Sequence, residues 1–398
     1  MLLRFMKILH LMLDWVFTDA AVSVFRSFEK SLGFENDFVC LREDDSTTFS
    51  KIKLTSDVRW VRVGSEAYRK LLEKGRYDVV LVGWTGRLER EFVLSLDKDV
   101  IVMWCTWGQD YMRFSGIWLY GLRTTLFWVR MYSIKTVLKT LVAYLLAKLS
   151  LVRYLPYLDC RFARRINFFS TVVPTEEEYV RKLVGRHAVK LPYYWFETTR
   201  ANSDCDVAVD LSKRRIWVGN SGAITNNHLD LFHVLRNVSE DYELYVPLSY
   251  SLNGERVTER IVQTGVKMFG NRFVPIRDFK PLDEYAAMMR ECSVFVFGHR
   301  RQQSVGNIGI ALRNGGCVFM NPVSPVYVYY LQNGVKIYPL SRLRELEKVL
   351  AEFTALQRKN ICRYNELRKR EKFVDEMLQT VEFLNNEVRA KGGLRSKM

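Results

Sequence analysis

The chain has 398 residues, a hydrophobic fraction of 48% and a formal net charge of +16. This length and composition exclude an intrinsically disordered chain and fit two globular domains. The excess of Lys and Arg favours an anionic partner, such as a phosphorylated substrate, an anionic membrane or a nucleic acid.

The cysteines and the apolar segments restrict the class of protein further. The seven cysteines are scattered, with no CxxC pair and no Cys/His spacing suited to zinc. We therefore expect reduced, mostly buried thiols in a cytoplasmic protein. Charges interrupt the apolar start, which fits a first core strand better than a signal peptide. No stretch offers the roughly 18 uninterrupted apolar residues of a membrane-spanning helix.

Strand-like and helix-like segments alternate along the chain, which predicts parallel sheets covered by helices. In the first half we expect strands at 7–13, 37–41, 59–63, 78–82, 100–104 and 167–173. In the second half we expect strands at 215–219, 243–247, 272–275, 293–298, 317–320 and 335–338. Helices are expected there at 226–236, 254–264, 282–290 and 304–313, with one long charged helix from 342 to 388.

The alternation predicts an α/β protein with two Rossmann-like, doubly wound domains facing a cleft, followed by a long C-terminal helix. The chain turns irregular around 190–205, so the domains are placed at 1–195 and 206–340, with a helical segment at 341–398. Ligands of such sheets bind at the carboxyl ends of strands, so those ends are the first candidates for a site.

The stretch "IWVGNSGAITNNH", residues 216–228, joins an expected strand to an expected helix through small polar residues. Gly219 and Gly222 let the backbone approach a ligand, and Asn226 is suited to cap the helix. A helix start also presents free N–H groups, which suit phosphate or carboxylate. An ordinary strand–turn–helix connection remains the alternative.

A second such connection is "CSVFVFGHRRQQSVGNIGIALRNGG", residues 292–316. Arg300 and Arg301 follow the strand, and Gly306 and Asn307 open the next helix. An Arg pair beside a helix N-terminus matches a diphosphate, because guanidinium binds phosphate oxygens in pairs. The alternative is two solvated arginines on a loop.

Four motifs, which occur along the chain in the family's order, resemble the bacterial 4-alpha-L-fucosyltransferase family, the TDP-N-acetylfucosamine:lipid II N-acetylfucosaminyltransferases. They are "VGNSG" at Val218, Gly219, Asn220, Ser221 and Gly222 with Thr225, Asn226 and His228; "VP-x-x-Y" at Val246, Pro247 and Tyr250; "RQQ-x-x-G" at Arg301, Gln302, Gln303 and Gly306; and "W-x-x-WG-x-D" at Trp104, Trp107, Gly108 and Asp110. The sequence departs from the family pattern at Ala223, Arg300 and Ser304, which leaves the donor sugar and nucleotide open.

The resemblance implies a GT-B type glycosyltransferase that binds the donor mainly with its second domain. Gly219, Asn220, Ser221, Gly222, Asn226, His228, Pro247, Tyr250, Gly306 and Asn307 would line the donor pocket. Arg301, Gln302 and Gln303 would hold the diphosphate and stabilise the leaving nucleotide, without a metal or other cofactor. The patterns Asp97–Asp99 and Asp204–Asp206 are too short to indicate a metal site.

Transfer to a sugar hydroxyl calls for a general base, unless the leaving phosphate serves as one. The candidates follow strands of the first domain. Asp14 follows the first strand, Asp19 is near it, and Asp110 follows the fifth. Asp110 has the best motif support, although a helix-capping role explains it equally well.

Residues 111–158 contain no acidic side chain but seven Lys and Arg among many Leu and aromatic residues. Such a composition suits an anionic membrane surface, with residues 111–165 lying on the bilayer. The family's acceptor is an undecaprenyl-diphosphate-linked glycan. We therefore expect a peripheral protein on the cytoplasmic face of the bacterial inner membrane.

Two other readings stay open. The same fold could use a UDP- or GDP-sugar in O-antigen or capsule synthesis. A non-catalytic basic protein that binds membranes or nucleic acid would also explain the charge. Nucleic acid is not the expected partner, because the cations are concentrated among Leu and Trp and no nucleic-acid motif is present.

Overall fold

The computed structural model describes residues 5–15, 17–46, 48–149, 151, 157–192, 208–249 and 254–395, in two compact units. The first unit comprises Met1–Gly116, Ala143–Arg200 and Arg370–Met398, and the second comprises Ile117–Val142 and Ala201–Lys369. The chain thus leaves each unit and returns to it.

The first unit is built on a parallel sheet of seven strands in the order β3-β2-β1-β4-β5-β6-β7. Its strands are β1 Met6–Met12, β2 Phe34–Arg42, β3 Val58–Arg62, β4 Val79–Val82, β5 Ile101–Cys105, β6 Phe168–Ser170 and β7 Val189–Lys190. Every residue of β4 and β5 is buried, as a parallel sheet covered on both faces requires.

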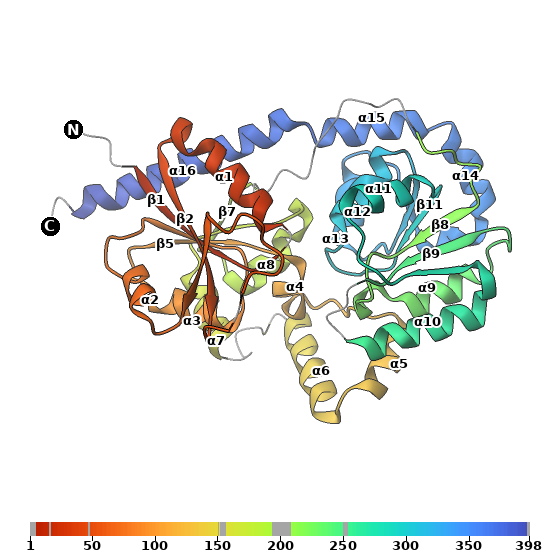
Figure 1. The fold of residues 1–398 in the computed structure, drawn as a ribbon, viewed down its shortest axis with the longest axis horizontal. Coiled ribbons are helices and arrows are strands. Elements are labelled where there is room, and N and C mark those ends of the chain that lie inside the picture. Colours follow the sequence, from red (N-terminus) through yellow and green to blue (C-terminus); the bar gives the residue numbers. More distant parts are fainter. Residues whose placement is uncertain are drawn as a thin grey trace. The chain divides into compact units, whose positions relative to one another are not determined.

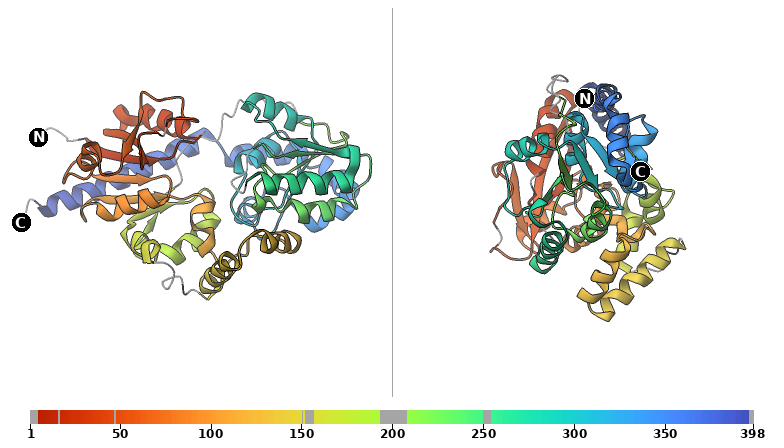
Figure 2. Two further views of the ribbon diagram at one scale, coloured as in Figure 1. Left: turned by 60° about the horizontal axis from the view of Figure 1, so that its bottom comes forward. Right: turned by 90° about the vertical axis from the view of Figure 1, so that its right-hand side faces the viewer.

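Helices cover both faces of this sheet (Figures 1 and 2). One face packs against α1 Thr18–Leu32 and α16 Arg370–Arg395, through side chains such as Phe25 and Met377. On the other face, Phe162 of α7 Tyr157–Arg165 meets Trp104 edge to face. The remaining helices of this unit are α2 Glu66–Leu71, α3 Arg87–Ser95, α4 Gly108–Tyr111, η1 Met112–Phe114, η3 Pro174–Glu176 and α8 Glu177–Val184.

The second unit is built on six parallel strands in the order β10-β9-β8-β11-β12-β13. They are β8 Arg215–Val218, β9 Glu243–Pro247, β10 Phe273–Ile276, β11 Val294–Phe297, β12 Cys317–Met320 and β13 Tyr338–Pro339. In both sheets the strand order reverses beside the unit's first strand, between β1 and β4 and between β8 and β11. These switch points are where doubly wound sheets bind ligands.

Helices also cover both faces of the second sheet (Figure 1). One face packs on α9 His228–Leu235, α10 Glu255–Phe269 and α14 Leu346–Thr354. The unit further contains α5 Leu122–Met131, α11 Leu282–Arg290, α12 Val305–Arg313, α13 Pro325–Gln332, α15 Gln357–Leu367, η4 Ile224–Asn226, η5 Gly270–Arg272 and η6 Leu340–Glu345. Helix α6 Ile134–Lys148 carries the chain from the second unit into the first.

The predicted strands are confirmed as elements, within a few residues at each end. The single long helix expected at 342–388 is wrong, because η6, α14, α15 and α16 divide that stretch. Each piece buries a different face: Phe353 joins the core of the second unit, whereas Met377 joins that of the first. The breaks between these helices let each piece turn its apolar side to its own core.

Candidate active site

The loop after β8 and the loop after β11 lie at the carboxyl ends of neighbouring strands in the second unit. Gly219 ends the first of these strands with φ of +74°, a conformation that favours glycine. A Cβ atom there would lie 2.8 Å from Nε2 of His228 and 3.0 Å from Oδ1 of Asn226. The glycine therefore lets two polar side chains close in on the strand end.

Asn226 organises the loop after β8. Its Oδ1 accepts a hydrogen bond from the backbone N–H of Asn220 at 3.2 Å. Its Nδ2 donates to the carbonyl oxygens of Ser221 and Ala223 at 2.9 and 3.2 Å. Because Asn226 is fully buried, losing these bonds would leave the backbone groups unsatisfied. This side chain holds the loop in shape.

Asn227 ties this loop to two other segments of the same unit. It adopts a left-handed conformation with φ of +57°. Its Nδ2 donates to the carbonyl of Gly298, just after β11, at 2.9 Å, and to the carbonyl of Leu119 at 3.1 Å. Its Oδ1 accepts from the backbone N–H of Gly121 at 2.9 Å. Sequence reasoning did not single out Asn227, although Asn is among the residues that best tolerate this conformation.

Gln303 joins the two predicted motifs directly. Its Oε1 accepts a hydrogen bond from the Thr225 hydroxyl at 2.8 Å, and its Nε2 donates to Oδ1 of Asn220 at 2.9 Å. The structure therefore brings "VGNSG" and "RQQ" together, as two loops at one edge of the sheet.

Among the described residues, two histidines at this edge have no hydrogen-bond partner for either ring nitrogen. His228 and His299 are both buried, and His299 stacks on Phe297 with the ring centroids 5.5 Å apart. Burial lowers the pKa of each imidazole to about 3, so both are neutral at physiological pH. After burial and the charge of Arg301, a proton on His228 would lower the pKa of His299 further, so the two rings lie near each other. Unpaired buried imidazoles are costly in a folded protein unless a ligand or water completes them.

The two arginines after β11 differ in their contacts. Arg300 donates from Nη1 to the carbonyl oxygen of Tyr120 at 3.0 Å, which fixes it to its own unit. Arg301 donates to the carbonyl oxygen of Gln302 at 2.9 Å and is only half buried. Helix α12 follows directly, after Ser304 in a left-handed conformation with φ of +63°. The N–H groups of a first helical turn have no partner within the helix, so this start suits an anion.

The other residues predicted to bind the donor differ in burial and in hydrogen bonding. Ser221 and Gly222 are buried in the loop after β8, and Pro247 is the buried last residue of β9. Asn307 donates from Nδ2 to the hydroxyl of Tyr285 at 2.6 Å, so its amide already has a partner. Gly306 is exposed with open space around it. Tyr250 lies outside the described residues.

The predicted carboxylates Asp14 and Asp19 both hold a loop of the first unit. Asp14 accepts hydrogen bonds from the backbone N–H groups of Ser50, Lys51 and Ile52 at 2.7–2.9 Å. Partial burial acts to raise its pKa, but these bonds outweigh burial and hold the pKa of Asp14 below its usual value. Asp19 accepts from the backbone N–H of Lys53 at 3.0 Å. A carboxylate whose pKa is lowered in this way, as that of Asp14 is, makes a weak base.

Asp110 lies after β5 in the first turn of α4. Its Oδ2 accepts a hydrogen bond from the backbone N–H of Trp107 at 3.0 Å, which caps the helix. Trp107 in turn stacks on Phe17, with ring centroids 5.6 Å apart. The carboxylate is half exposed at the carboxyl edge of the sheet. This geometry is compatible with both the capping role and the catalytic role.

Glu89 is a further carboxyl group at this edge that sequence reasoning missed. It lies in the first turn of α3, after β4, and is 6% exposed. Burial raises the pKa of Glu89 to about 7, against the backbone N–H groups of Glu89 and Gly86, which lower it. Burial and then the negative charges of Asp14 and Glu89 raise the pKa of the Cys40 thiol. Glu89 therefore lies close to the β1–β4 switch point. A carboxyl group with this pKa is suited to general acid–base chemistry near neutrality.

The first of the two Asp-x-Asp patterns lies away from the candidate site edges. Asp97 and Asp99 precede β5, at the amino end of that strand, and residues 204–206 lie outside the described residues. In the part of the chain that the structure describes, no three His, Cys, Asp or Glu side chains are grouped to hold a metal ion.

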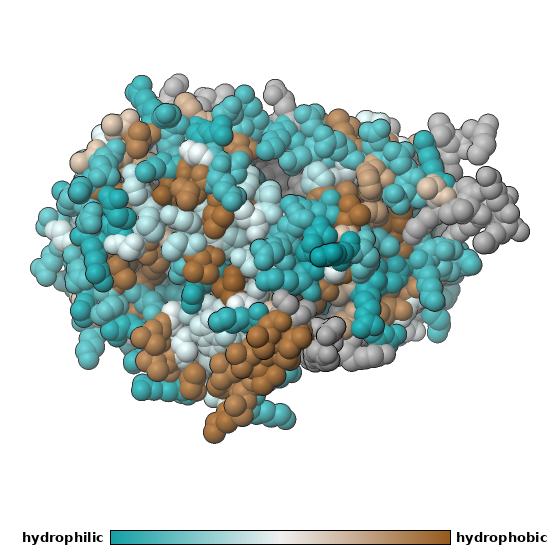
Figure 3. Space-filling view, turned by 180° about the vertical axis from the view of Figure 1, so that it is seen from behind, coloured by the Kyte–Doolittle hydropathy of each residue, from teal (hydrophilic) through white to brown (hydrophobic). Residues whose placement is uncertain are grey.

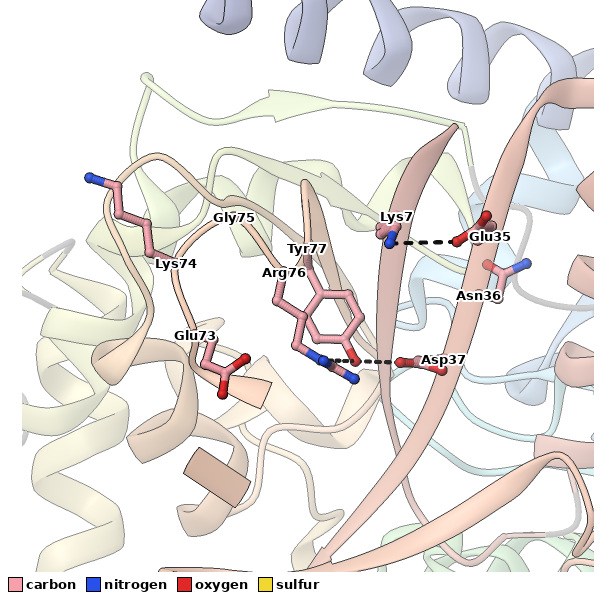
Figure 4. Close-up of a pocket in the computed structure, with 9 residues that line it drawn as sticks. All are labelled: Lys7, Glu35, Asn36, Asp37, Glu73, Lys74, Gly75, Arg76 and Tyr77. Atoms are coloured by element: carbon pink, nitrogen blue, oxygen red, sulfur yellow. Dashed lines mark hydrogen bonds and ion pairs between the residues drawn. The ribbon is translucent and has the colours of Figure 1, made fainter. Parts of the chain in front are cut away.

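A charged pocket of about 360 Å³ opens at the amino edge of the first sheet (Figure 4). Its walls carry their own partners: Lys7 pairs with Glu35 at 3.9 Å, and Tyr77 donates to Asp37. Because doubly wound sheets bind ligands at the opposite edge, and because these charges neutralise one another, this pocket is a poor candidate for the reaction centre.

Comparison with known proteins agrees with this arrangement. Residues 144–333 match the sequence model of the family described as 4-alpha-L-fucosyltransferase glycosyl transferase group 56. The structure is similar to sucrose-phosphate synthase from Thermosynechococcus elongatus, with a TM-score of 0.64, 13% identity, and coverage of 96% of this chain and 99% of that chain.

Two further solved structures share the fold. Anabaena HepE in complex with UDP and glucose has a TM-score of 0.60 and 12% identity, covering 96% of this chain and 100% of its own. An alpha-glucosyltransferase in complex with UDP and DNA has a TM-score of 0.55 and 12% identity, covering 95% of this chain and 100% of its own. The expected GT-B fold and the family resemblance are confirmed. The chain has the fold of GT-B glycosyltransferases, and its residues 144–333 match the sequence model of the 4-alpha-L-fucosyltransferase family.

Proposed function

We propose that the protein transfers a deoxyamino sugar similar to N-acetylfucosamine from a TDP-sugar to an undecaprenyl-diphosphate-linked glycan in bacterial surface polysaccharide assembly. The observation that carries the donor half of this proposal is the hydrogen-bonded pair of loops at the β8–β11 switch point, joined through Gln303. The structural relatives HepE and the alpha-glucosyltransferase were solved with UDP, which supports a nucleotide sugar as the donor class.

In this proposal the second unit holds the nucleoside diphosphate. Arg301 and the start of α12 stabilise the negative charge that develops on the leaving diphosphate, which is the most effective use of such donors. The neutral imidazoles of His228 and His299 complete their hydrogen bonds on the bound donor. Because arginine and helix N–H groups supply the positive charge, the proposed reaction needs no metal ion.

The first unit supplies the base that accepts the proton of the acceptor hydroxyl. Glu89 is the better candidate by environment, since its pKa lies near neutrality. Asp110 is the better candidate by motif. Both lie at the carboxyl edge of the same sheet, after β4 and β5.

The proposed acceptor is anchored in a bilayer, so we place the enzyme peripherally on the cytoplasmic face of the bacterial inner membrane. Within the described residues no helix is both long and apolar enough to cross a bilayer. Support for surface contact comes from the exposed apolar side chains of α5 and α6, among them Leu122, Ile134 and Leu138, which are 75%, 79% and 56% exposed.

Calorimetric titration with TDP, UDP, GDP and CMP, each with and without magnesium, tests the donor assignment. We expect TDP to bind most tightly and equally with and without magnesium. Preference for UDP or GDP would replace the donor and point to O-antigen or capsule synthesis. Binding of none of the four would overturn the donor pocket.

A further inference from the structure

A groove of about 800 Å³ lies between α5, α9 and α10, away from the loops of the donor site but within the same unit. Five arginines line it: Arg123 and Arg130 on α5, Arg236 after α9, and Arg256 and Arg260 on α10. Only one carboxylate is among the lining residues, Glu259, and it is already paired with Arg277.

Acidic side chains among the described residues compensate only part of the positive charge of this groove. In the described ranges of the chain, none of the five arginines forms an ion pair with a carboxylate. The two carboxylate oxygens of nearby Asp230 accept hydrogen bonds from the backbone N–H groups of Arg123 and Thr124, at 3.0 Å each. Burial and then the charges of Arg123, Arg236 and Arg344 lower the pKa of His233, which also lines the groove. Like charges kept together without partners favour an anion from outside the chain.

Apolar side chains continue the same surface. Leu126, Phe127, Met131, Leu229 and Met268 line the groove together with the arginines. Beyond it, hydrophobic side chains gather over α5 and α6 (Figure 3). Ile134, Leu138, Leu141 and Leu145 recur at helical spacing along α6, and all four are exposed. An exposed apolar row beside a cationic groove is costly in water and marks an interaction surface.

We propose that this groove, here named the α5–α9–α10 groove, binds the phosphate headgroups of anionic phospholipids while the apolar row of α5 and α6 enters the bilayer interface. The inference rests on the proposed membrane location, and it adds a headgroup site that includes three arginines outside residues 111–165. A nucleic acid would satisfy the cations as well, but it offers nothing to the exposed leucines and isoleucine.

Flotation with vesicles of phosphatidylcholine, with and without phosphatidylglycerol, tests the proposal. The variant Arg256→Gln/Arg260→Gln changes two groove cations on α10. We expect its binding to anionic vesicles to be about 30-fold weaker than wild type, since each such cation near an anionic surface contributes a factor of about five. The matched control Arg358→Gln/Lys359→Gln removes the same charge from exposed positions of α15 and should bind as wild type does.

The outcomes separate this inference from the wider function. Unchanged binding of the α10 variant, equal loss in the α15 control, or equal wild-type binding to neutral vesicles would overturn the headgroup site and leave the membrane location standing. Wild-type protein that binds TDP but no vesicles would overturn both the headgroup site and the membrane location, and leave the donor site standing. Tighter binding to duplex DNA than to anionic vesicles would overturn the headgroup site and make nucleic acid the ligand of the groove. Calorimetry with TDP confirms that each variant is folded.

Discussion

At the β8–β11 edge of the second unit the loops are held by amides, whereas at the β1–β4 edge of the first unit they are held by carboxylates. Asn226 and Gln303 offer neutral donors and acceptors, beside two arginines and two neutral imidazoles. Asp14 and Asp19 clamp their loop with negative charge, and Glu89 is buried beside them. The same switch-point geometry thus suits an anionic leaving group in one unit and proton transfer in the other.

The largest expected effect is the loss of transfer rate when Glu89, the proposed base of the first unit, is replaced. Glu89→Gln keeps the shape but removes the base, so we expect the transfer rate to fall by roughly 10²- to 10⁴-fold. In the wild type, kcat/KM should rise with pH up to about 7, where Glu89 loses its proton. Glu91→Gln on the same helix is the matched control. Near-normal turnover of Glu89→Gln, with a large loss in Asp110→Asn, would assign the base to Asp110.

The next effect tests the cationic side of the comparison. Arg301→Ala removes charge from the leaving diphosphate, so transfer should fall by roughly 10²- to 10³-fold with little change in melting temperature. Arg300→Ala removes the bond to the Tyr120 carbonyl and should lower the melting temperature instead. Kinetics and thermal unfolding of the two variants are compared. The division of roles fails if Arg300→Ala lowers transfer as much as Arg301→Ala.

A smaller effect is expected from Gln303, whose hydrogen bonds join the two donor loops. Gln303→Ala removes two hydrogen bonds, together about 1–3 kcal/mol, so donor binding should weaken roughly 5- to 150-fold. Asn307→Ala should weaken donor binding less, because that amide is bound to Tyr285. Titration with TDP measures both. Equal affinities of wild type and Gln303→Ala for TDP would show that the hydrogen bonds of Gln303 do not shape the donor pocket.

The smallest effect is a pH dependence of stability. The folded-state pKa of Glu89, about 7, is raised above its ordinary value of 4.5, so the neutral group contributes stability below about pH 4.5 that is lost as pH rises through about 7. Wild type should therefore lose stability relative to Glu89→Gln between pH 5 and pH 8, by at most about 3 kcal/mol. Urea unfolding at both pH values measures the difference. A constant difference would show that Glu89 titrates normally.

The strands and the donor loops could be predicted because their signals are local. β11 is a continuous apolar run that ends in Gly298, and "VGNSG" follows a similar run, so pattern and chain order suffice. Helix α13 was missed because "PVYVYYLQ" is rich in β-branched and aromatic residues that read as a strand. There Ser324 and Pro325 begin a helix that buries Tyr330.

The role of the carboxylates could not be read from the sequence because it depends on distant contacts. Asp14 bonds to a loop 36 to 38 residues further along the chain. Glu89 stands in "RLEREFV", where alternating charges resemble a solvated helix face, and its burial is visible only once α3 has packed against the rest of the unit. Asp14 was proposed as a base and Glu89 was overlooked for the same reason. A sequence shows which side chains carry charge, but it does not show their environment.

Asn227 joins the donor loops to the start of α5. One amide bonds the end of β11, the turn before α5 and, through its own backbone, the loop after β8. A turn of α5 relative to the sheet would break these buried bonds together. Asn227 therefore couples the position of α5, which lines the α5–α9–α10 groove, to the shape of the donor loops.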